Sequence, residues 1–225
     1  MLKLTYHGHS CFELDAEGHR VIVDPFLNGN THAKVKPSDL KVEAILISHG
    51  HGDHVGDAVE IAKKNRCPVV ANYEIAGWFQ GQGVEAHPMH IGGSHTFPFG
   101  RAKLTPAAHG SALPDGTYGG LAAGFLVWMG GKCVYYAGDT GLHSDMALYG
   151  RIHPIDLALL PIGDNFTMGV DDAVEAAILC QAKEAMPIHF DTFPVIAADP
   201  KEFVRKLEAR GGKGRLVGFG ETITV

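Results

Sequence analysis

An apolar run that ends in a histidine-rich turn is the feature that most constrains this chain of 225 residues. Residues 44–47 read Ala-Ile-Leu-Ile, and a short apolar run of this kind fits a buried strand. Residues 48–54 follow as Ser-His-Gly-His-Gly-Asp-His, which places three imidazoles and one carboxylate within six residues. Imidazole and carboxylate are the usual ligands of zinc and related divalent ions. The segment therefore predicts a metal site at the end of a buried strand.

The spacing within this turn suits two ions. Residues i and i+2 share a face of a strand, so His49 and His51 are able to point at one ion. Asp53 and His54 come after a glycine, which allows the backbone to turn and to direct them towards another ion.

The pattern H-x-H-x-D-H at residues 49–54 resembles the signature of the metallo-β-lactamase superfamily. In that superfamily the rest of the chain supplies a further His, a bridging Asp and a last His, in that order. The matching positions are His109, Asp139 and His189, and each follows a plausible strand. The resemblance covers nearly the whole chain. Ser48 departs from the Thr that is more common there, without changing a ligand.

Among such proteins, the chain looks closest to small metal-dependent hydrolases grouped with ascorbate-6-phosphate lactonase. Residues 6–10 and 23–26 look like the first strands of such a hydrolase, and residues 161–169 support this branch. The branch favours a phosphorylated or lactone substrate. The resemblance implies an α/β fold, the four-layer αββα sandwich of two mixed β-sheets flanked by helices.

The resemblance also assigns the ligands of two divalent ions. All are imidazoles or carboxylates: His49, His51 and His109 for one ion, Asp53, His54 and His189 for the other, and Asp139 as the bridge. A hydroxide between the ions would be the nucleophile that cleaves a small-molecule ester, lactone or phosphodiester, and Asp53 would also shuttle the proton as a catalytic residue. Zinc is the first expectation, and manganese, iron or nickel also suit mixed His and carboxylate ligands.

Other side chains are candidates for supporting this site. Metal-bound imidazoles usually donate their second N–H to a carboxylate or carbonyl, which suggests a supporting role for Asp24 and His9. Asn165, on a glycine-flanked loop, either places an amide near a developing oxyanion or simply makes the turn. Phe190, Phe193 and Pro194 follow the last ligand and form either an apolar wall or lid over the site or ordinary packing. The isolated cations that would suit a phosphate group are Arg101, Lys103 and Arg151.

Short apolar runs separated by Gly, Pro and Asn predict strands along most of the chain. The expected strands are residues 3–6, 11–14, 20–23, 44–47, 69–71, 121–129, 132–137, 157–160 and 185–188. Helices are expected from near residue 55 to 62, over 172–182 and over 200–210, with a hairpin turn at residues 130–131. No linker-like segment divides the chain, so we expect residues 1–225 to form a single domain of two packed sheets with helices outside.

Composition excludes several classes of protein. The formal charge of −6 argues against a nucleic-acid surface, which usually needs a basic stripe. The apolar stretches end well before the roughly 18 residues of a membrane span, and the N-terminus lacks the pattern of a secretion signal. The four cysteines form no C-x-x-C pair, which indicates reduced, mostly buried thiols. We therefore expect a cytoplasmic enzyme that acts on a small molecule and forms homo-oligomers.

Three alternatives use the same fold or ligands. Diiron oxygen or nitric-oxide reductases replace a His of the motif with Glu and need a flavin domain, and this chain has neither feature. An RNA-processing phosphodiesterase usually carries an RNA-gripping arm, for which the chain has no obvious candidate. A non-catalytic metal-binding protein would keep the centre without turnover. A variant of Asp53 separates the last case, because an enzyme would lose turnover and a binder would lose at most metal.

Overall fold

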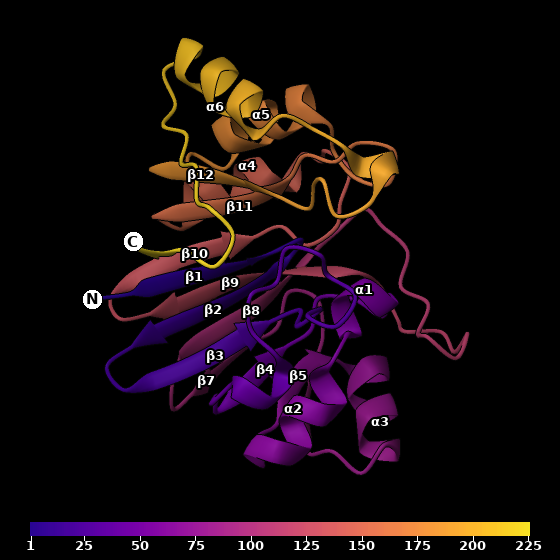
Figure 1. Ribbon diagram of the computed structural model, residues 1–225. Helices are drawn as coiled ribbons and strands as arrows, with labels where there is room; N and C mark the ends of the chain where they lie inside the picture. The colour runs from indigo at the N-terminus through magenta and orange to yellow at the C-terminus, as the bar shows by residue number, and fades with distance from the viewer.

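Two mixed β-sheets lie face to face in the computed structural model, which describes residues 1–225 (Figure 1). The strands of the first sheet, in spatial order, are β13 (Thr222–Thr224), β1 (Lys3–Gly8), β2 (Cys11–Ala16), β3 (His19–Val23), β4 (Ala44–Leu46), β5 (Val69–Asn72) and β6 (Ala86–Met89). Those of the second sheet are β12 (Glu184–Ile188), β11 (Leu157–Pro161), β10 (Lys132–Tyr136), β9 (Ala123–Met129), β8 (Gly100–Pro106) and β7 (Ser94–Phe97). Neighbours from β3 to β6 and from β10 to β12 are parallel, and the other neighbours are antiparallel.

Helices cover the outer face of each sheet. Three accompany the first sheet, namely α1 (Gly52–Val55), α2 (Ala58–Asn65) and α3 (Tyr73–Gly81), and three accompany the second, namely α4 (Asp145–Ile152), α5 (Val170–Leu179) and α6 (Pro200–Ala209). Short 3-10 helices occur at η1 (Pro37–Asp39) and η2 (Pro194–Ile196). The four-layer αββα sandwich expected from the sequence is confirmed (Figure 1). No helix combines the length and the apolar character needed to span a membrane.

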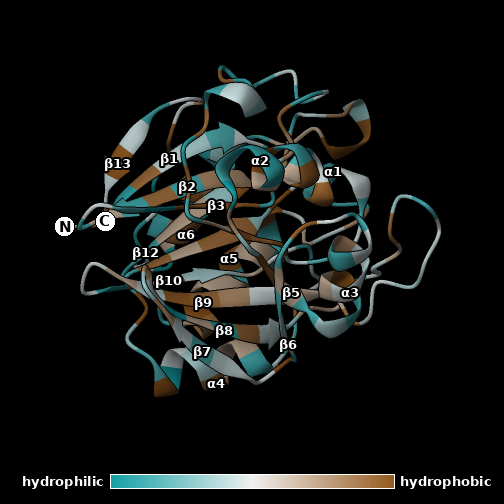
Figure 2. Ribbon diagram, turned by 90° about the horizontal axis from the view of Figure 1, so that it is seen from below, coloured by the Kyte–Doolittle hydropathy of each residue, from teal (hydrophilic) through white to brown (hydrophobic).

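Burial on both faces explains why the central strands read as continuous apolar runs. In β4, Ala44 and Leu46 pack into the core between the sheets, whereas Ile45 packs into the cluster beneath the helices. Leu159 and Leu160 divide in the same way in β11. Successive side chains of a strand point to opposite faces, so a strand covered on both sides is apolar at every position. Figure 2 shows such hydrophobic strand segments, for instance in β9, in the middle of the molecule.

The helix expected from residue 55 to 62 is wrong in one respect, because two helices occupy this region. Gly56 separates α1 from α2 with a φ of +43°, and a Cβ there would lie 2.5 Å from the carbonyl oxygen of Pro25. The Asp57 carboxylate then accepts hydrogen bonds from the backbone N–H groups of Leu27 and Asn28 at 2.9 and 2.8 Å. Asp53 therefore lies inside a short helix of its own rather than ahead of a longer one.

Most other boundaries move by only one to three residues. The expected helix over 172–182 begins earlier, at α5, and ends at Leu179, while the hairpin turn at residues 130–131 joins β9 to β10 as expected. The strands β6, β7 and β13 and the helices α3 and α4 add to the expected elements, and β8 is the strand expected before His109. All four cysteines are free and buried, which confirms the expectation of separate thiols.

Ion pairs connect the C-terminal segment to the second sheet. Glu184 at the start of β12 accepts hydrogen bonds from the Lys213 ammonium at 2.5 Å and from the Arg215 guanidinium at 2.6 Å. Partial burial opposes the charged carboxylate, but these two cations lower the pKa of Glu184 below its ordinary value of 4.5. The cluster therefore stabilises the fold while Glu184 is ionised.

Glu184→Gln should lower the free energy of unfolding by about 1 kcal/mol at pH 7, as expected for a partly exposed ion pair. A folded-state pKa below the unfolded one gives stability that is present above pH 4.5 and is lost as the pH falls through the folded value. Urea unfolding at pH 7 and pH 3 measures this, and the difference between variant and wild type should shrink at pH 3. An equal difference at both pH values would contradict the assignment.

Candidate metal centre

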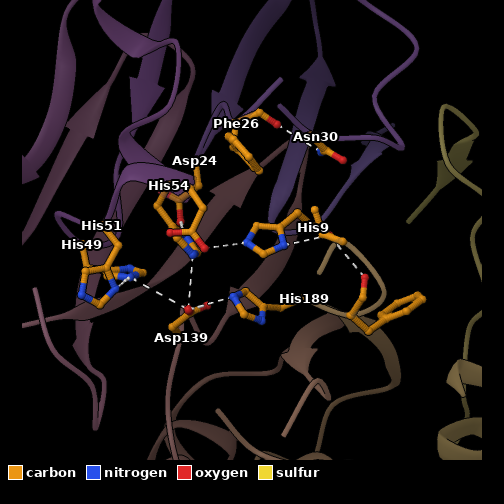
Figure 3. Close-up of polar contacts among 12 residues, drawn as sticks. His9, Asp24, Phe26, Asn30, His49, His51, His54, Asp139 and His189 are labelled. Carbon is orange, nitrogen blue, oxygen red and sulfur yellow. Dashed lines mark hydrogen bonds and ion pairs between the residues drawn. The ribbon is translucent and has the colours of Figure 1, made fainter. Parts of the chain in front are cut away.

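The predicted ligands come together at one edge of the two sheets, although they are spread over 141 positions from His49 to His189. Each comes shortly after the end of a strand: His49 and His51 after β4, His109 after β8, Asp139 after β10 and His189 after β12. Asp53 and His54 lie in α1, directly beyond β4. Figure 3 shows the side chains of His49, His54 and His189 turned towards Asp139.

One group of ligand atoms consists of three imidazoles. The Nδ1 atom of His51 lies 2.9 Å from Nε2 of His49 and 3.3 Å from Nε2 of His109. The Oδ2 atom of Asp139 is 4.0 Å from Nε2 of His49 and 3.6 Å from Nε2 of His109. Two ligands that are each about 2.0–2.1 Å from one tetrahedral zinc ion lie roughly 3.3 Å apart, so these distances suit a shared ion.

A second group lies on the other side of Asp139. Its Oδ2 atom is 3.3 Å from Nε2 of His54 and 2.9 Å from Nε2 of His189. Asp53 and His9 complete this group, in which the potential ligand atoms all lie within 4.8 Å of one another. Asp139 therefore has one carboxylate oxygen within 4.0 Å of four imidazole nitrogens, two from each group.

Unpartnered buried atoms test whether these residues fit metal ions. Nε2 of His54, Nε2 of His189 and Oδ1 of Asp139 are buried, and none of their contacts has the geometry of a hydrogen bond, including those of the two nitrogens with Oδ2 of Asp139 at 3.3 and 2.9 Å. Buried polar atoms in proteins are almost always paired, because leaving them unpaired costs free energy. Divalent cations would satisfy these atoms, and the donor set of imidazoles and carboxylates suits them. The residues therefore fit a pair of divalent ions.

The buried carboxylates and imidazoles of this cluster shift one another's pKa values. Burial opposes the charged form of His54, but Asp139 and Asp24 raise the pKa of His54 well above its ordinary value. Burial likewise opposes ionisation of Asp139, yet His54 and His189 hold the pKa of this carboxyl well below its usual range. Burial lowers the pKa of His49, which keeps this imidazole neutral and able to bind a cation.

Asp24 supports His54 from the side away from Asp139. Its Oδ2 atom accepts hydrogen bonds from Nδ1 of His54 at 2.7 Å, from the Tyr136 hydroxyl at 2.6 Å and from the Ser48 hydroxyl at 2.5 Å. The Ser48 backbone N–H donates to Oδ1 at 2.8 Å. All four residues are buried. Because both oxygens of Asp24 are already used, this carboxylate orients His54 rather than binding an ion itself.

His9 supports Asp53 in a similar way. Its Nε2 lies 3.1 Å from Oδ2 of Asp53, its Nδ1 lies 2.9 Å from the Thr192 hydroxyl, and its ring centroid is 4.1 Å from that of His189. Burial lowers the pKa of His9 to about 4, so the ring is neutral at pH 7. Burial opposes the ionisation of Asp53, but the hydrogen bond from His9 holds the pKa of Asp53 well below its usual range. The neutral ring thus donates to an ionised carboxylate.

The remaining candidates separate into those near the site and those away from it. Asn165 is exposed in a turn with a φ of +52° and does not line the cavity, in keeping with its alternative role in making the turn. Phe190 is buried in the core beneath the helices, in keeping with its alternative role as a packing residue, whereas Phe193 lines the cavity because the backbone turns between them. Arg101 lies over the Trp128 ring and does not line the cavity.

A cavity of about 240 Å³ opens beside the ligand atoms. Its lining combines ligands with apolar side chains: His51, Asp53, His109, Asp139, Phe166, His189, Phe193 and Ile196. Sequence reasoning anticipated Phe193 but missed Phe166 and Ile196. It also missed Thr192 and Tyr136, which touch the site only through His9 and Asp24.

Known proteins share both the sequence and the architecture. A model of the beta-lactamase superfamily domain matches residues 19–190. A UPF0173 metal-dependent hydrolase of Bacillus cereus is 54% identical, and the match covers 100% of both chains.

Solved structures give the same result. Igni18, a metallo hydrolase from the hyperthermophilic archaeon Ignicoccus hospitalis, is 35% identical and superposes with a TM-score of 0.91, covering 100% of this chain and 98% of that one. The metallo-beta-lactamase fold protein YhfI from Bacillus subtilis superposes with a TM-score of 0.77 over 100% of both chains, and at 14% identity it shares the fold alone.

Proposed function

Because the chain belongs to the UPF0173 family of metal-dependent hydrolases, within the beta-lactamase superfamily, we propose that it uses two divalent ions, zinc first among them, to hydrolyse a small-molecule ester, lactone or phosphodiester. The observation that carries the proposal is the position of Asp139. One oxygen of its carboxylate lies within 4.0 Å of four imidazole nitrogens from two groups of ligands, as a residue that bridges two ions would. Asp139 would be shared, with His49, His51 and His109 on one side and Asp53, His54 and His189 on the other.

Divalent ions in such a site supply Lewis acidity, which polarises the substrate oxygen and lowers the pKa of water. The residues of the chain do the rest. Asp53 is ionised and lines the cavity, so it is able to accept a proton from water and to pass it on to the leaving group. His9 fixes the orientation of that carboxylate, and Asp24 fixes the orientation of His54. The apolar lining limits the access of bulk water to the reacting bond.

Two observations favour a small molecule over RNA as the substrate. The cavity of about 240 Å³ is smaller than most ligand pockets, and no Lys or Arg lines it. The formal charge of −6 also opposes the approach of a polyanion. The proposal includes a cytoplasmic homo-oligomer, which light scattering and cell fractionation would test.

The first experiment combines elemental analysis of the reconstituted protein with a hydrolysis screen. Chromogenic esters, lactones, thioesters and phosphodiesters are tested with and without chelator. We expect about two ions per chain and turnover that chelator abolishes. A protein that takes up no metal after reconstitution would overturn the proposal.

Asp53→Asn then separates an enzyme from a metal-binding protein without turnover. Loss of proton transfer should lower kcat by about 10²–10⁴-fold. Full turnover in this variant would contradict the role of Asp53. Metal uptake without any turnover in the wild type, across the whole screen, would favour the binding protein.

A further inference from the structure

Two loops supply the apolar part of the cavity lining. The first follows His189 and is closed on itself, because the Asp191 backbone N–H donates to the Ile196 carbonyl at 3.0 Å and the Ala198 N–H donates to the Asp191 carboxylate at 3.0 Å. The Ile196 N–H donates in turn to the Phe193 carbonyl at 3.0 Å. These hydrogen bonds within the loop hold Phe193 and Ile196 at the cavity.

Aromatic neighbours also support Phe193 from behind. Its ring centroid lies 5.6 Å from that of His9, edge to face, and 6.3 Å from that of Phe26. Figure 3 shows His9 and Phe26 side by side next to the ligands. Phe193 nevertheless remains 37% exposed, so one part of the ring packs and the other faces the cavity.

The second loop carries Phe166. Asp164 has a φ of +59°, and its backbone N–H donates to the Met168 carbonyl at 3.0 Å, so the loop forms a closed turn. Phe166 sits in this turn, lines the cavity and is 56% exposed. Gly163 joins the two loops, since a Cβ there would lie 2.4 Å from the carbonyl oxygen of His189. The two loops therefore lie in contact, and Phe166, Phe193 and Ile196 together form the apolar part of the cavity lining.

Charge on the cavity lining comes only from the ligands themselves. No Lys or Arg lines it. Arg101 stacks on Trp128 and donates to Ser94 at 2.8 Å, and the Lys103 ammonium donates to the Gly92 carbonyl at 2.6 Å. A phosphate or carboxylate on the apolar side of the cavity would lose its hydration without gaining a partner, which is costly. The lining therefore selects against charge beside the scissile bond.

We propose that the substrate carries an apolar, uncharged group of roughly phenyl size next to the bond that is cleaved, and that Phe166, Phe193 and Ile196 hold it. This inference rests on the proposed hydrolase function. It favours a hydrophobic ester or lactone over the phosphorylated substrate that the sequence suggested. Aromatic side chains suit this task because they offer a large, stiff apolar surface.

A matched pair of esters with one leaving group tests the inference. Methyl butyrate and methyl hemisuccinate have acyl chains of similar length, and only the second carries a charge. Their methanol leaving group is too small to fill the subsite itself, and acid release followed in a pH-stat measures both rates. We expect kcat/KM to be at least about tenfold higher for the butyrate, in line with the discrimination of an apolar pocket. Phe193→Ala should lower kcat/KM for the butyrate by about 10-fold or more and that for the hemisuccinate by clearly less. Phe166→Ala, at a more exposed position, should act in the same direction.

Val195→Ala is the matched control, because Val195 lies in η2, two residues after Phe193, is 53% exposed and does not line the cavity. Binding gives a second readout that needs no turnover. The probe is 4-fluorobenzyl alcohol, which is neutral and contains no hydrolysable ester, followed by ¹⁹F NMR. Its Kd should rise about tenfold or more in Phe193→Ala and stay constant in Val195→Ala.

The outcomes separate the two proposals. A preference for the hemisuccinate, or equal losses for both esters in Phe193→Ala, would overturn the apolar subsite and leave the hydrolase standing. Binding of the alcohol that depends on Phe193, without hydrolysis of any ester in the screen, would support the subsite and count against the proposed function. Absence of both binding and hydrolysis would overturn both.

Discussion

Asp139→Asn should lower the bound metal from about two ions per chain to one or fewer and reduce kcat/KM by about 10³-fold or more. The substitution keeps the volume of the side chain and removes its charge. Asp139 is the only residue whose carboxylate lies within 4.0 Å of imidazoles from both ligand groups, so neither group retains an anion at this position. Loss of several kcal/mol of transition-state stabilisation corresponds to the stated fall in rate. Elemental analysis and steady-state kinetics measure the two effects.

The matched control for this variant is Asp171→Asn. Asp171 is an exposed carboxylate in α5 whose only ion pair is with Lys206. It undergoes the same chemical change away from the ligands, and it should keep both ions and full activity. Two tightly bound ions together with full activity in Asp139→Asn would disprove the bridging role.

Local sequence signals and the superfamily resemblance were sufficient to bring the candidate ligands to one edge of the sheets, because most of them directly follow a strand. The strand ends deliver His109, Asp139 and His189 to the same edge, and the order of residues matches the superfamily pattern. The sandwich itself was predictable for a related reason, since apolar runs without alternation indicate sheets buried on both faces. Both the strand ends and the apolar runs are visible in short segments of the chain.

Contacts between distant segments were not predictable in this way. Thr192 is 183 positions from His9, and Tyr136 is 112 positions from Asp24, so no periodicity connects them. The break at Gly56 has the same origin, because the backbone of residue 25 approaches too closely for a side chain.

The direction of side chains in irregular loops could not be predicted from the sequence either. Phe190 and Phe193 are close in sequence, but the backbone between them has a φ of +58° at Asp191, which sends one ring into the core and the other to the cavity. Neither strand nor helix periodicity applies to such a segment. Only the folded loop shows that Phe166, from a different segment, faces the same cavity.

Asp24→Ala should lower the free energy of unfolding of the metal-free protein by about 3–5 kcal/mol, the range expected when one partner of a buried charge pair is removed. Asp24 accepts hydrogen bonds from His54, Ser48 and Tyr136, which are all buried. Its loss removes the acceptor of the His54 ring N–H and of the Tyr136 hydroxyl, whereas the Ser48 hydroxyl still has Nδ1 of His49 at 3.0 Å. His54 also loses the carboxylate that orients its ring. Affinity for metal should therefore fall by about 10–100-fold, as for other groups that orient a ligand. Urea unfolding and competition with a chromogenic chelator measure these quantities.

Tyr136→Phe provides the comparison that isolates the charge. It removes a single hydroxyl donor from the Asp24 carboxylate and leaves the contact between Asp24 and His54 intact, so it should cost only about 1 kcal/mol and leave metal affinity nearly unchanged. For Asp24→Asn, the losses of unfolding free energy and of metal affinity should fall between those of the two variants. An amide keeps the volume and one acceptor but lacks the negative charge that stabilises protonated His54. If Asp24→Ala proved no more damaging than Tyr136→Phe in both measurements, the network would serve only to pack the two sheets, and the orientation of His54 would have another source.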